Sequence, residues 1–386
     1  MAWSFASIVG GAAGGLLLVV ILIGLIWFCL KFKKFSNKNS ETGSSDPSAL
    51  VEWNRGGGST SVGGPTLSGP QGARQFILEE LEQATKQFSE NNLIGGGSFG
   101  LVYKGLLRDG TFVAVKRRFG VPRQEFVEEV VCYLSEIQHR NLVTLLGYCQ
   151  EDGFQMLVFE YLPNDSVCGH LYDNGKDSTT QLEFKQRLSI ALGAAKGLCY
   201  LHSMTPPVVH KNFKTVNVLV DENFIPKVAD AGIFRLLERI EDAGPSSGST
   251  GDNVFRDPEV GKSGPLSEFS DVYSFGVFLL ELVTGKEVSM ISFLGSAECL
   301  TKWVESRLSS NNLVDSRLTS SFTSEGMKDL IRLTLGCLNI SGKGRPKMDL
   351  VVSELDRILE KEMTRTTVMG AGTAIVTPGS ELFTSH

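Results

Sequence analysis

The sequence predicts an α+β protein in which a strand-rich lobe precedes a larger helical lobe, with one membrane-spanning helix before both. Short β-rich runs between Leu93 and about Leu162 are typical of strands, and one helical stretch interrupts them. From there to about Leu359 apolar residues recur mostly at helical spacing, as between Phe184 and His202. A chain of 386 residues, 42% of them hydrophobic, is long and apolar enough to bury a core of this size.

Residues 8–30 carry no charge and are predicted to form a transmembrane helix, because about 20 apolar residues cross the hydrocarbon core of a bilayer. A cleaved signal peptide is the alternative, but its apolar region usually covers about 7 to 15 residues after a basic start. Residues 1–7 contain no basic side chain. Lys31, Lys33 and Lys34 follow the apolar segment, so the positive-inside rule places residues 1–7 outside and the rest inside. We expect a single-pass membrane protein whose outer segment is too short for a ligand-binding ectodomain.

The segments on either side of the two lobes differ from them in composition. Residues 31–73 are rich in Ser, Gly, Asn and Pro and show little apolar periodicity, so we expect a disordered juxtamembrane linker. Residues 361–386 are rich in Thr, Gly and Ser and are expected to form a disordered tail. The folded domain is therefore predicted to cover residues 74–360.

Charge and cysteine content argue against some functions. A net charge of −6 and an isoelectric point near 5.6 provide no basic field, so composition does not support nucleic-acid binding. The 7 cysteines show no metal-ligand spacing. Free thiols in a reducing cytosol are the simplest interpretation.

A glycine-rich turn lies near the start of the strand-rich lobe. Its pattern G-x-G-x-x-G-x-V starts at Gly95, and glycines in such a turn let the backbone approach phosphate groups closely. Dinucleotide-binding folds and ordinary loops use the same pattern. Lys116 ends the following strand, Val113-Ala114-Val115-Lys116, where its ammonium would contact the α- and β-phosphates of a nucleotide. Taken singly, a lysine on an edge strand is more simply a surface residue.

Four further segments follow in order: FSENNLIG at 88–95, HRNLV at 139–143, LVFEY at 157–161 and DVYSFG at 271–276. Together with the glycine-rich turn and Lys116, they make residues 74–359 resemble the receptor-like kinase family of plants. The resemblance implies a bilobal protein kinase fold, ATP and Mg²⁺ as cofactors, and a place at the plasma membrane. It also implies that other receptor kinases or signalling proteins are the partners.

The resemblance assigns roles to single residues. Phe159 would be the gatekeeper beside a hinge formed by residues 160–162. Asp271 would brace the catalytic loop, and Arg345 would pair with Glu259. The implied ATP contacts are Gly95, Gly97, Gly100, Val102, Ala114, Lys116, Glu160, Leu162 and Leu219, the implied Mg²⁺ ligands are Asn217 and Asp230, and the implied catalytic positions are His210, Asn212 and Lys214.

The catalytic loop, residues 209–217, departs from the family pattern. Asn212 stands where His-Arg-Asp has its aspartate, the base that accepts the proton of the substrate hydroxyl. The spacing to Asn217 is intact, so the alignment is unambiguous. A neutral amide can hold the hydroxyl but cannot take its proton. General-base catalysis contributes about 100- to 10,000-fold, or roughly 3 to 5.5 kcal/mol of barrier, so we expect a severe loss of activity rather than an absolute one.

A second departure occurs at Asp230-Ala231-Gly232, where the family has Asp-Phe-Gly. Asp230 and Asn217 could still bind magnesium. Ala231 cannot fill the slot that the phenylalanine occupies between the lobes, so a cavity or a shifted helix is expected. Local repacking by a neighbouring side chain is the alternative.

The activation segment, residues 251–259, reads GDNVFRDPE where the family pattern is G-T-x-G-Y-x-A-P-E. Asp252 replaces the threonine that normally meets the catalytic aspartate, which favours relaxed substrate selection. The hydroxyl residues within 246–250 are candidate phosphorylation sites, although an unmodified Gly/Ser loop is the simpler interpretation.

The helix of the strand-rich lobe has an ambiguous register. Counted from Phe126, Glu129 takes the place of the glutamate that pairs with Lys116. Counted back from Leu134, Val130 takes that place, because one residue is extra. Adjacent helical residues point about 100° apart, so both cannot hold in an uninterrupted helix. Since Leu134 belongs to the buried face, Val130 is predicted to face Lys116 unless a π-bulge restores Glu129.

The favoured function is a membrane-anchored pseudokinase that binds ATP and signals mainly through protein contacts. A slow Ser/Thr kinase is one alternative, because loose phosphoryl transfer permits a water or phosphate oxygen to accept the proton. A nucleotide-free signalling scaffold is the other. It applies if Lys116 is unpaired and the cleft is collapsed.

Overall fold

The computed structural model describes residues 73–172, 182–238, 254–260, 265–290, 297–310, 312–318 and 322–369. The predicted transmembrane helix at 8–30 and its flanks, 1–7 and 31–72, lie outside the described residues. Residues 239–253, which include Asp252, lie outside them too. None of the described helices is both long and apolar enough to cross a membrane.

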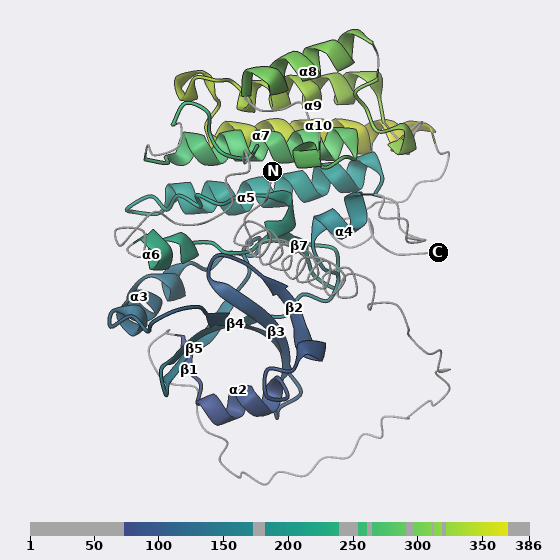
Figure 1. Cartoon of the computed structure of the whole chain (residues 1–386). Helices are drawn as coiled ribbons and strands as arrows, with labels where there is room; N and C mark the ends of the chain where they lie inside the picture. The colour runs from purple at the N-terminus through teal and green to yellow at the C-terminus, as the bar shows by residue number, and fades with distance from the viewer. Residues whose placement is uncertain are drawn as a thin grey trace, which may run out of the picture. The chain divides into compact units, whose positions relative to one another are not determined.

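The first part of the described chain forms a six-stranded sheet accompanied by helices (Figure 1). The strand order is β1-β5-β6-β4-β3-β2, in which β1 pairs with β5 in parallel and the other neighbours are antiparallel. The elements are β1 (Arg74–Gln75), α2 (Leu78–Ala84), β2 (Leu93–Gly96), β3 (Gly100–Leu106), β4 (Phe112–Arg118), α3 (Phe126–Cys132), β5 (Leu145–Glu151) and β6 (Phe154–Glu160).

Alternation along β4 separates the core of this small lobe from its candidate site. Val113 and Val115 are completely buried and share one apolar cluster with Phe76. Successive residues of a strand point to opposite faces of the sheet. Ala114 and Lys116 therefore lie on the face opposite this cluster.

The second part of the chain is mainly helical, as the sequence predicts (Figure 1). Helix α5 packs against α7 and α10, and α9 packs against the same two helices. The elements are α4 (Val167–Leu171), α5 (Phe184–Ser203), β7 (Val218–Val220), β8 (Pro226–Val228), α6 (Ile233–Glu238), α7 (Glu268–Thr284), α8 (Ala297–Ser309), α9 (Ser324–Cys337) and α10 (Met348–Met369). The strands β7 and β8 form a separate antiparallel pair next to α5.

Helix α7 lies at the centre of the large lobe, because every residue from Ser270 to Thr284 is buried. Its start is fixed by a capping box in which Ser267 and Ser270 each accept a hydrogen bond from the other's backbone N–H. It ends at Gly285, whose φ of 64° is a left-handed conformation that glycine adopts without strain. The helix thereby carries the carboxylate of Asp271 into the core.

Helix α10 continues to Met369, past the predicted domain end at residue 360. Glu362 explains the extension: it is buried, and its carboxylate accepts hydrogen bonds from the backbone N–H of Thr323, at 3.0 Å, and from its hydroxyl. The predicted disordered tail was therefore wrong for residues 361–369. Residues 370–386 lie outside the described chain.

Candidate functional site

The predicted nucleotide contacts of the small lobe lie on one face of its sheet. Val102 is directly opposite Lys116 in the β3–β4 pair, and Ala114 lies two residues before Lys116 on β4. Phe159 of β6 is opposite Ala114. Residues that are paired across strands, or two apart on one strand, share a face. The Nζ atom of Lys116 lies 5.7 Å from the centroid of the Phe159 ring.

The fold requires glycine at Gly100 but not at Gly95 or Gly97. A side chain at Gly100 would collide with the backbone carbonyl of Arg117, so strand pairing itself requires glycine there. At Gly95 and Gly97 an added Cβ would meet no atom within 4 Å, and neither residue has a positive φ. The fold does not need glycine at these two positions, and the lack of side chains keeps the turn open to a ligand.

An ion pair joins the two lobes at the predicted phosphate and metal positions. The Nζ atom of Lys116 donates to Oδ1 of Asp230, and the two side chains are 16% and 23% exposed. Asp230 follows β8 and has a φ of 66°, a conformation uncommon outside glycine. The fold therefore brings the β4 lysine against the aspartate of the Asp-Ala-Gly motif.

Glu129 is not the partner of Lys116. It pairs with Arg123, with 3.2 Å between Arg123 Nη1 and Glu129 Oε2. Arg123 also donates to the backbone carbonyl of Leu236 in α6. The possible ion pair between Glu129 and Lys116 is thus wrong, because the Glu129 carboxylate pairs with Arg123 on the segment before α3.

The extra residue of this region is accommodated by a break in the helix. Helix α3 ends at Cys132, and Tyr133 leaves the helical conformation with φ −131° and ψ −59°. A single 3₁₀ turn, Leu134–Glu136, follows. Val130 is completely buried, as the register counted from Leu134 predicts. No π-bulge is needed to reconcile the two counts.

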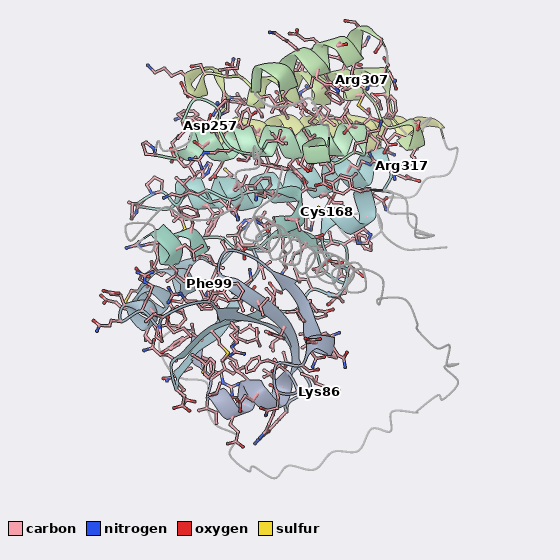
Figure 2. The ribbon with its side chains drawn as sticks, viewed as in Figure 1. Lys86, Phe99, Cys168, Asp257, Arg307 and Arg317 are labelled. Carbon is pink, nitrogen blue, oxygen red and sulfur yellow. The ribbon has the colours of Figure 1, made fainter. Side chains whose placement is uncertain are left out.

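Ala231 packs, half-buried, against the main apolar cluster of the molecule. A Cβ added to the next residue, Gly232, would lie 2.6 Å from Ile137 Cδ1 and 2.9 Å from Leu134 Cδ2. The side chains of Leu134 and Ile137, which follow α3, therefore pack closely against the backbone of Gly232. Phe99, at the tip of the glycine-rich turn, is only 4% exposed and belongs to the same cluster (Figure 2). These contacts favour the alternative of local repacking around Ala231.

One buried carboxylate holds the catalytic loop. Asp271 accepts the backbone N–H of His210 at 2.7 Å and that of Lys211 at 2.9 Å, and it lies 2.9 Å from Nε2 of His202. Lys211 has a φ of 66°, a strained conformation that persists only where its surroundings enforce it. Asp271 is 1% exposed, so these bonds form away from water. Its predicted role as the brace of the loop is confirmed.

Internal hydrogen bonds fix the loop around Asn212. The buried His210 ring lies 2.9 Å from the carbonyl of Ala229 through Nε2, and its Nδ1 accepts the backbone N–H of Asn212 at 3.3 Å. The side-chain amide of Asn217 donates to the carbonyl of Asn212 at 2.9 Å. Phe213 is buried beneath the loop. Asn212 therefore stands on a well-held backbone with its side chain half-buried.

The predicted hinge is tied to the large lobe through a side chain. The carboxylate of Glu160 accepts the backbone N–H of Thr144 at 2.7 Å and pairs with Nζ of Lys227 at 2.7 and 2.8 Å. Lys227 lies on β8, opposite Leu219 of β7. Leu162, further along the hinge, is 8% exposed. Of the predicted ATP contacts, Glu160 and Leu162 therefore lie in the segment that joins the two lobes, and Leu219 lies on β7 of the large lobe, opposite the partner of Glu160.

Arg345 pairs with Asp257 and not with Glu259. Two parallel hydrogen bonds of 2.7 Å join its guanidinium to the Asp257 carboxylate, and these side chains are 0% and 1% exposed. Glu259 instead accepts the backbone N–H of Gly342 at 2.6 Å. The predicted Arg345–Glu259 pair was wrong because Asp257, where the family pattern has alanine, places a buried carboxylate within reach of the guanidinium.

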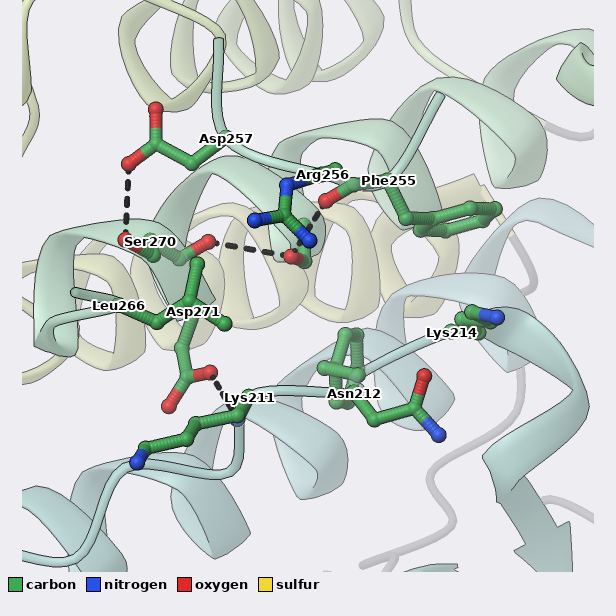
Figure 3. A pocket seen from close by; sticks show the side chains of 11 residues that line it. Lys211, Asn212, Lys214, Phe255, Arg256, Asp257, Leu266, Ser270 and Asp271 are labelled. Carbon is green, nitrogen blue, oxygen red and sulfur yellow. Dashed lines mark hydrogen bonds between the residues drawn. The ribbon is translucent and has the colours of Figure 1, made fainter. Parts of the chain in front are cut away.

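A small pocket of about 40 Å³ lies beside Asn212 (Figure 3). Residues 211–214 of the catalytic loop form one side, and Arg256 with its neighbours from the activation segment forms another. The start of α7 completes the lining. Lys214 is half-buried, and burial lowers the pKa of its ammonium.

Residues 88–355 match the family described as protein tyrosine and serine/threonine kinase. The chain belongs to the protein kinase family. The chain is 38% identical over 332 residues to the proline-rich receptor-like protein kinase PERK13 of Arabidopsis thaliana, a match that covers 82% of the chain and 46% of the relative. The chain therefore spans less than half the length of that curated relative.

Solved structures relate the kinase domain to pseudokinases. The pseudokinase domain of BIR2, an immune regulator of the RLK/Pelle family, is 30% identical with a TM-score of 0.61, and the match covers 74% of this chain and 86% of that one. The pseudokinase DRIK1, bound to ENMD-2076, is 24% identical with a TM-score of 0.58, over 75% and 97% of the two chains, and that likeness concerns the fold alone. The resemblance to receptor-like kinases and the bilobal kinase fold are both confirmed.

Three residues that sequence reasoning missed hold this site together. Arg123 pairs with Glu129, Lys227 pairs with Glu160, and Asp257 pairs with Arg345. No local pattern marks Arg123 or Lys227. Asp257 did carry a signal, because it replaces the alanine of the family pattern.

Replacing Asp257 with Asn should lower the free energy of unfolding by about 3–5 kcal/mol, because the buried Arg345 would lose its charged partner. Glu259→Gln is the matched control and should cost only about 1 kcal/mol, since its exposed carboxylate accepts one backbone hydrogen bond from Gly342 and a longer one from the Ser341 hydroxyl. Urea unfolding of the detergent-solubilised chain, followed by tryptophan fluorescence, measures both. A larger loss for Glu259→Gln would contradict the assigned pairing.

The same pair should make stability depend on pH. Burial alone would raise the pKa of Asp257, but hydrogen bonds from Arg345 and Ser270 outweigh it and hold this pKa below its ordinary value of 3.8. A lowered folded-state pKa adds stability that is present above the unfolded value and is lost as pH falls through the folded one. The difference between the parent and Asp257→Asn should therefore shrink as pH falls from about 5 to about 3.

Proposed function

We propose that this chain is a membrane-anchored receptor-like pseudokinase that binds ATP with Mg²⁺ and signals mainly through contacts with other proteins. One observation carries the proposal. Asn212 occupies the position of the catalytic base on a loop whose bracing by Asp271 and His210 is complete. The backbone of the loop is held in place, and the residue in the position of the base is an amide that does not accept the proton.

The amide of Asn212 limits what the loop does chemically. Its oxygen accepts a hydrogen bond from a substrate hydroxyl, so it still positions that group, but it does not take the proton at physiological pH. Phosphoryl transfer depends mostly on positioning and electrostatic stabilisation, so the loss is severe without being total. We therefore assign the chain a binding role rather than an enzymatic one.

The residues that remain fit a nucleotide with magnesium. Lys116 suits the α- and β-phosphates, and Asn217 and Asp230 supply the oxygen ligands that Mg²⁺ prefers. Bound Mg²⁺ would neutralise phosphate charge in this cleft. The open positions at Gly95 and Gly97 leave room for the phosphates. The ion pair between Lys116 and Asp230 does not oppose binding strongly, since each group exchanges one opposite charge for another.

A nucleotide-free scaffold is the second candidate, and two observations favour it. Lys116 lacks a glutamate partner from α3 and is neutralised by Asp230 instead, and Phe99 of the glycine-rich turn is buried in the main apolar cluster. Both would keep the cleft closed. We prefer the nucleotide-binding proposal because every residue type that it requires is present in register.

ATP with Mg²⁺ should raise the melting temperature of the purified full-length chain, because a ligand that binds only the native state stabilises it. At tenfold excess over the dissociation constant, the stabilisation is about 1.4 kcal/mol. Lys116→Met and Asp230→Asn should abolish most of this shift. Glu129→Gln should keep it, because Glu129 pairs with Arg123. No Mg²⁺-dependent shift at millimolar ATP would favour the scaffold instead.

Asn212→Asp restores the base, and with an otherwise complete site about 100- to 10,000-fold of rate should return. We expect a much smaller gain, because Glu129 is held by Arg123 and Ala231 leaves the family's phenylalanine slot repacked. Groups that act as a unit respond non-additively. The double variant Asn212→Asp with Ala231→Phe should therefore exceed the product of the single gains in autophosphorylation rate. A large recovery in Asn212→Asp alone would contradict several coupled defects.

The chain should fractionate with membranes and expose the kinase domain and C-terminus to the cytoplasm, because Lys31, Lys33 and Lys34 follow the apolar segment at 8–30. Protease added to sealed vesicles of known sidedness measures this orientation. Cleavage of the kinase domain from the outside, before the vesicles are opened, would reverse the assignment.

A further inference from the structure

The pocket beside Asn212 carries an uneven distribution of charge. Its cationic lining residues are Lys211, Lys214 and Arg256, and its acidic ones are Asp257 and Asp271. The acidic side chains are each 1% exposed, whereas the cationic residues are half-buried or exposed. The charges that an incoming group can reach are therefore positive.

Both carboxylates of the lining are also engaged by donors of the protein itself. Asp257 accepts two hydrogen bonds from Arg345 and one from the hydroxyl of Ser270. Asp271 accepts the backbone N–H groups of the catalytic loop. Their negative charge is directed at these internal donors rather than at the mouth of the pocket.

The amide at position 212 changes what this pocket accepts. An aspartate there would place a carboxylate beside any incoming anion and repel it. Asn212 is neutral, and its side-chain NH₂ donates hydrogen bonds. Figure 3 shows Asn212 between Lys211 and Lys214 along the loop, with the guanidinium of Arg256 on the other side of the pocket.

We propose that this pocket binds the phosphate group of a phosphorylated serine or threonine on a protein partner. In a kinase this position receives the free hydroxyl of a substrate, and in this chain it would receive that side chain already phosphorylated. A phosphomonoester carries a charge of about −1.5 to −2 and oxygen acceptors that suit arginine and amide donors. The volume of about 40 Å³ suits the short stem of these residues rather than a tyrosine ring.

The burial of Lys214 supports the same assignment. Burial lowers the pKa of its ammonium because the charged form is partly removed from water. A phosphate dianion beside it would favour the charged form again. The inference goes beyond the proposed function and does not depend on it, because Arg256 and Asn212 are not among the groups assigned to ATP or Mg²⁺.

The test uses the full-length chain in detergent micelles, produced without phosphorylation, and a fluorescent nonapeptide of Gly and Ala with a central phosphoserine. Matched peptides carry serine or phosphotyrosine at the same position. Fluorescence anisotropy measures the dissociation constants, and inorganic phosphate serves as the competitor. We expect the phosphoserine peptide to bind at least tenfold more tightly than the other two and inorganic phosphate to displace it.

Arg256→Gln should weaken binding of the phosphoserine peptide by about ten- to a hundredfold, because one charge-assisted contact is removed. Asn212→Asp should weaken it by a similar factor through repulsion, even though this variant restores the family residue. Arg332→Gln is the matched control: this arginine lies on α9 with a 77% exposed side chain, and its loss should leave binding unchanged.

Three results of the peptide titrations would overturn the proposal. These are equal affinity for the phosphorylated and unphosphorylated peptides, tighter binding of the phosphotyrosine peptide, or equal losses for Arg256→Gln and Arg332→Gln. The thermal shift with ATP and Mg²⁺, measured on Arg256→Gln, distinguishes the proposed phosphate site from the proposed nucleotide site. An intact shift combined with lost peptide binding supports a separate phosphate site, and loss of both would show a general defect and overturn it.

Discussion

The hydrogen bonds that Asp271 accepts from the backbone of the catalytic loop are the contact on which the candidate site depends. Asp271 lies at the start of α7, a helix buried along nearly its whole length, and so it is fixed by the core of the large lobe. It holds Lys211 in a left-handed conformation and thereby sets the direction of the residues that follow. The positions of Asn212 and Asn217 are therefore consequences of how α7 packs, although neither residue belongs to that helix.

A second constraint is that buried charges need partners, and three pairs in this fold differ from those that the family motifs suggest. Removing one partner of a buried pair is costly, so a charged group takes the nearest suitable partner that the backbone offers. Arg345 takes Asp257, whose carboxylate lies deeper than that of Glu259. Glu129 pairs with Arg123, and Lys116 therefore pairs with Asp230. These ion pairs stabilise the site, and they also change which charged groups meet in it.

Under the proposed function, these features would separate nucleotide binding from catalysis within one kinase domain. The residues that would hold a nucleotide are retained in register, while the group that would accept the proton is an amide. The same substitution removes a negative charge from the phosphoacceptor pocket, where the remaining carboxylates are engaged internally. The proposed loss of the base and the proposed anion-binding surface therefore both depend on one residue, Asn212.

The sequence by itself determined the family, the order of the two lobes and the place of each motif residue, because strand alternation, helical spacing and motif spacing are local properties. It also identified Asn212 and Ala231 as departures, since intact spacing made the alignment unambiguous. The Arg345–Asp257, Glu129–Arg123 and Glu160–Lys227 pairs were decided only by the tertiary structure. The partners in these pairs lie between 6 and 88 residues apart, and which carboxylate reaches which cation depends on burial and backbone direction. The break at Tyr133 and the extension of α10 were decided in the same way, because the packing of Val130 and Glu362 into the core outweighed the local pattern.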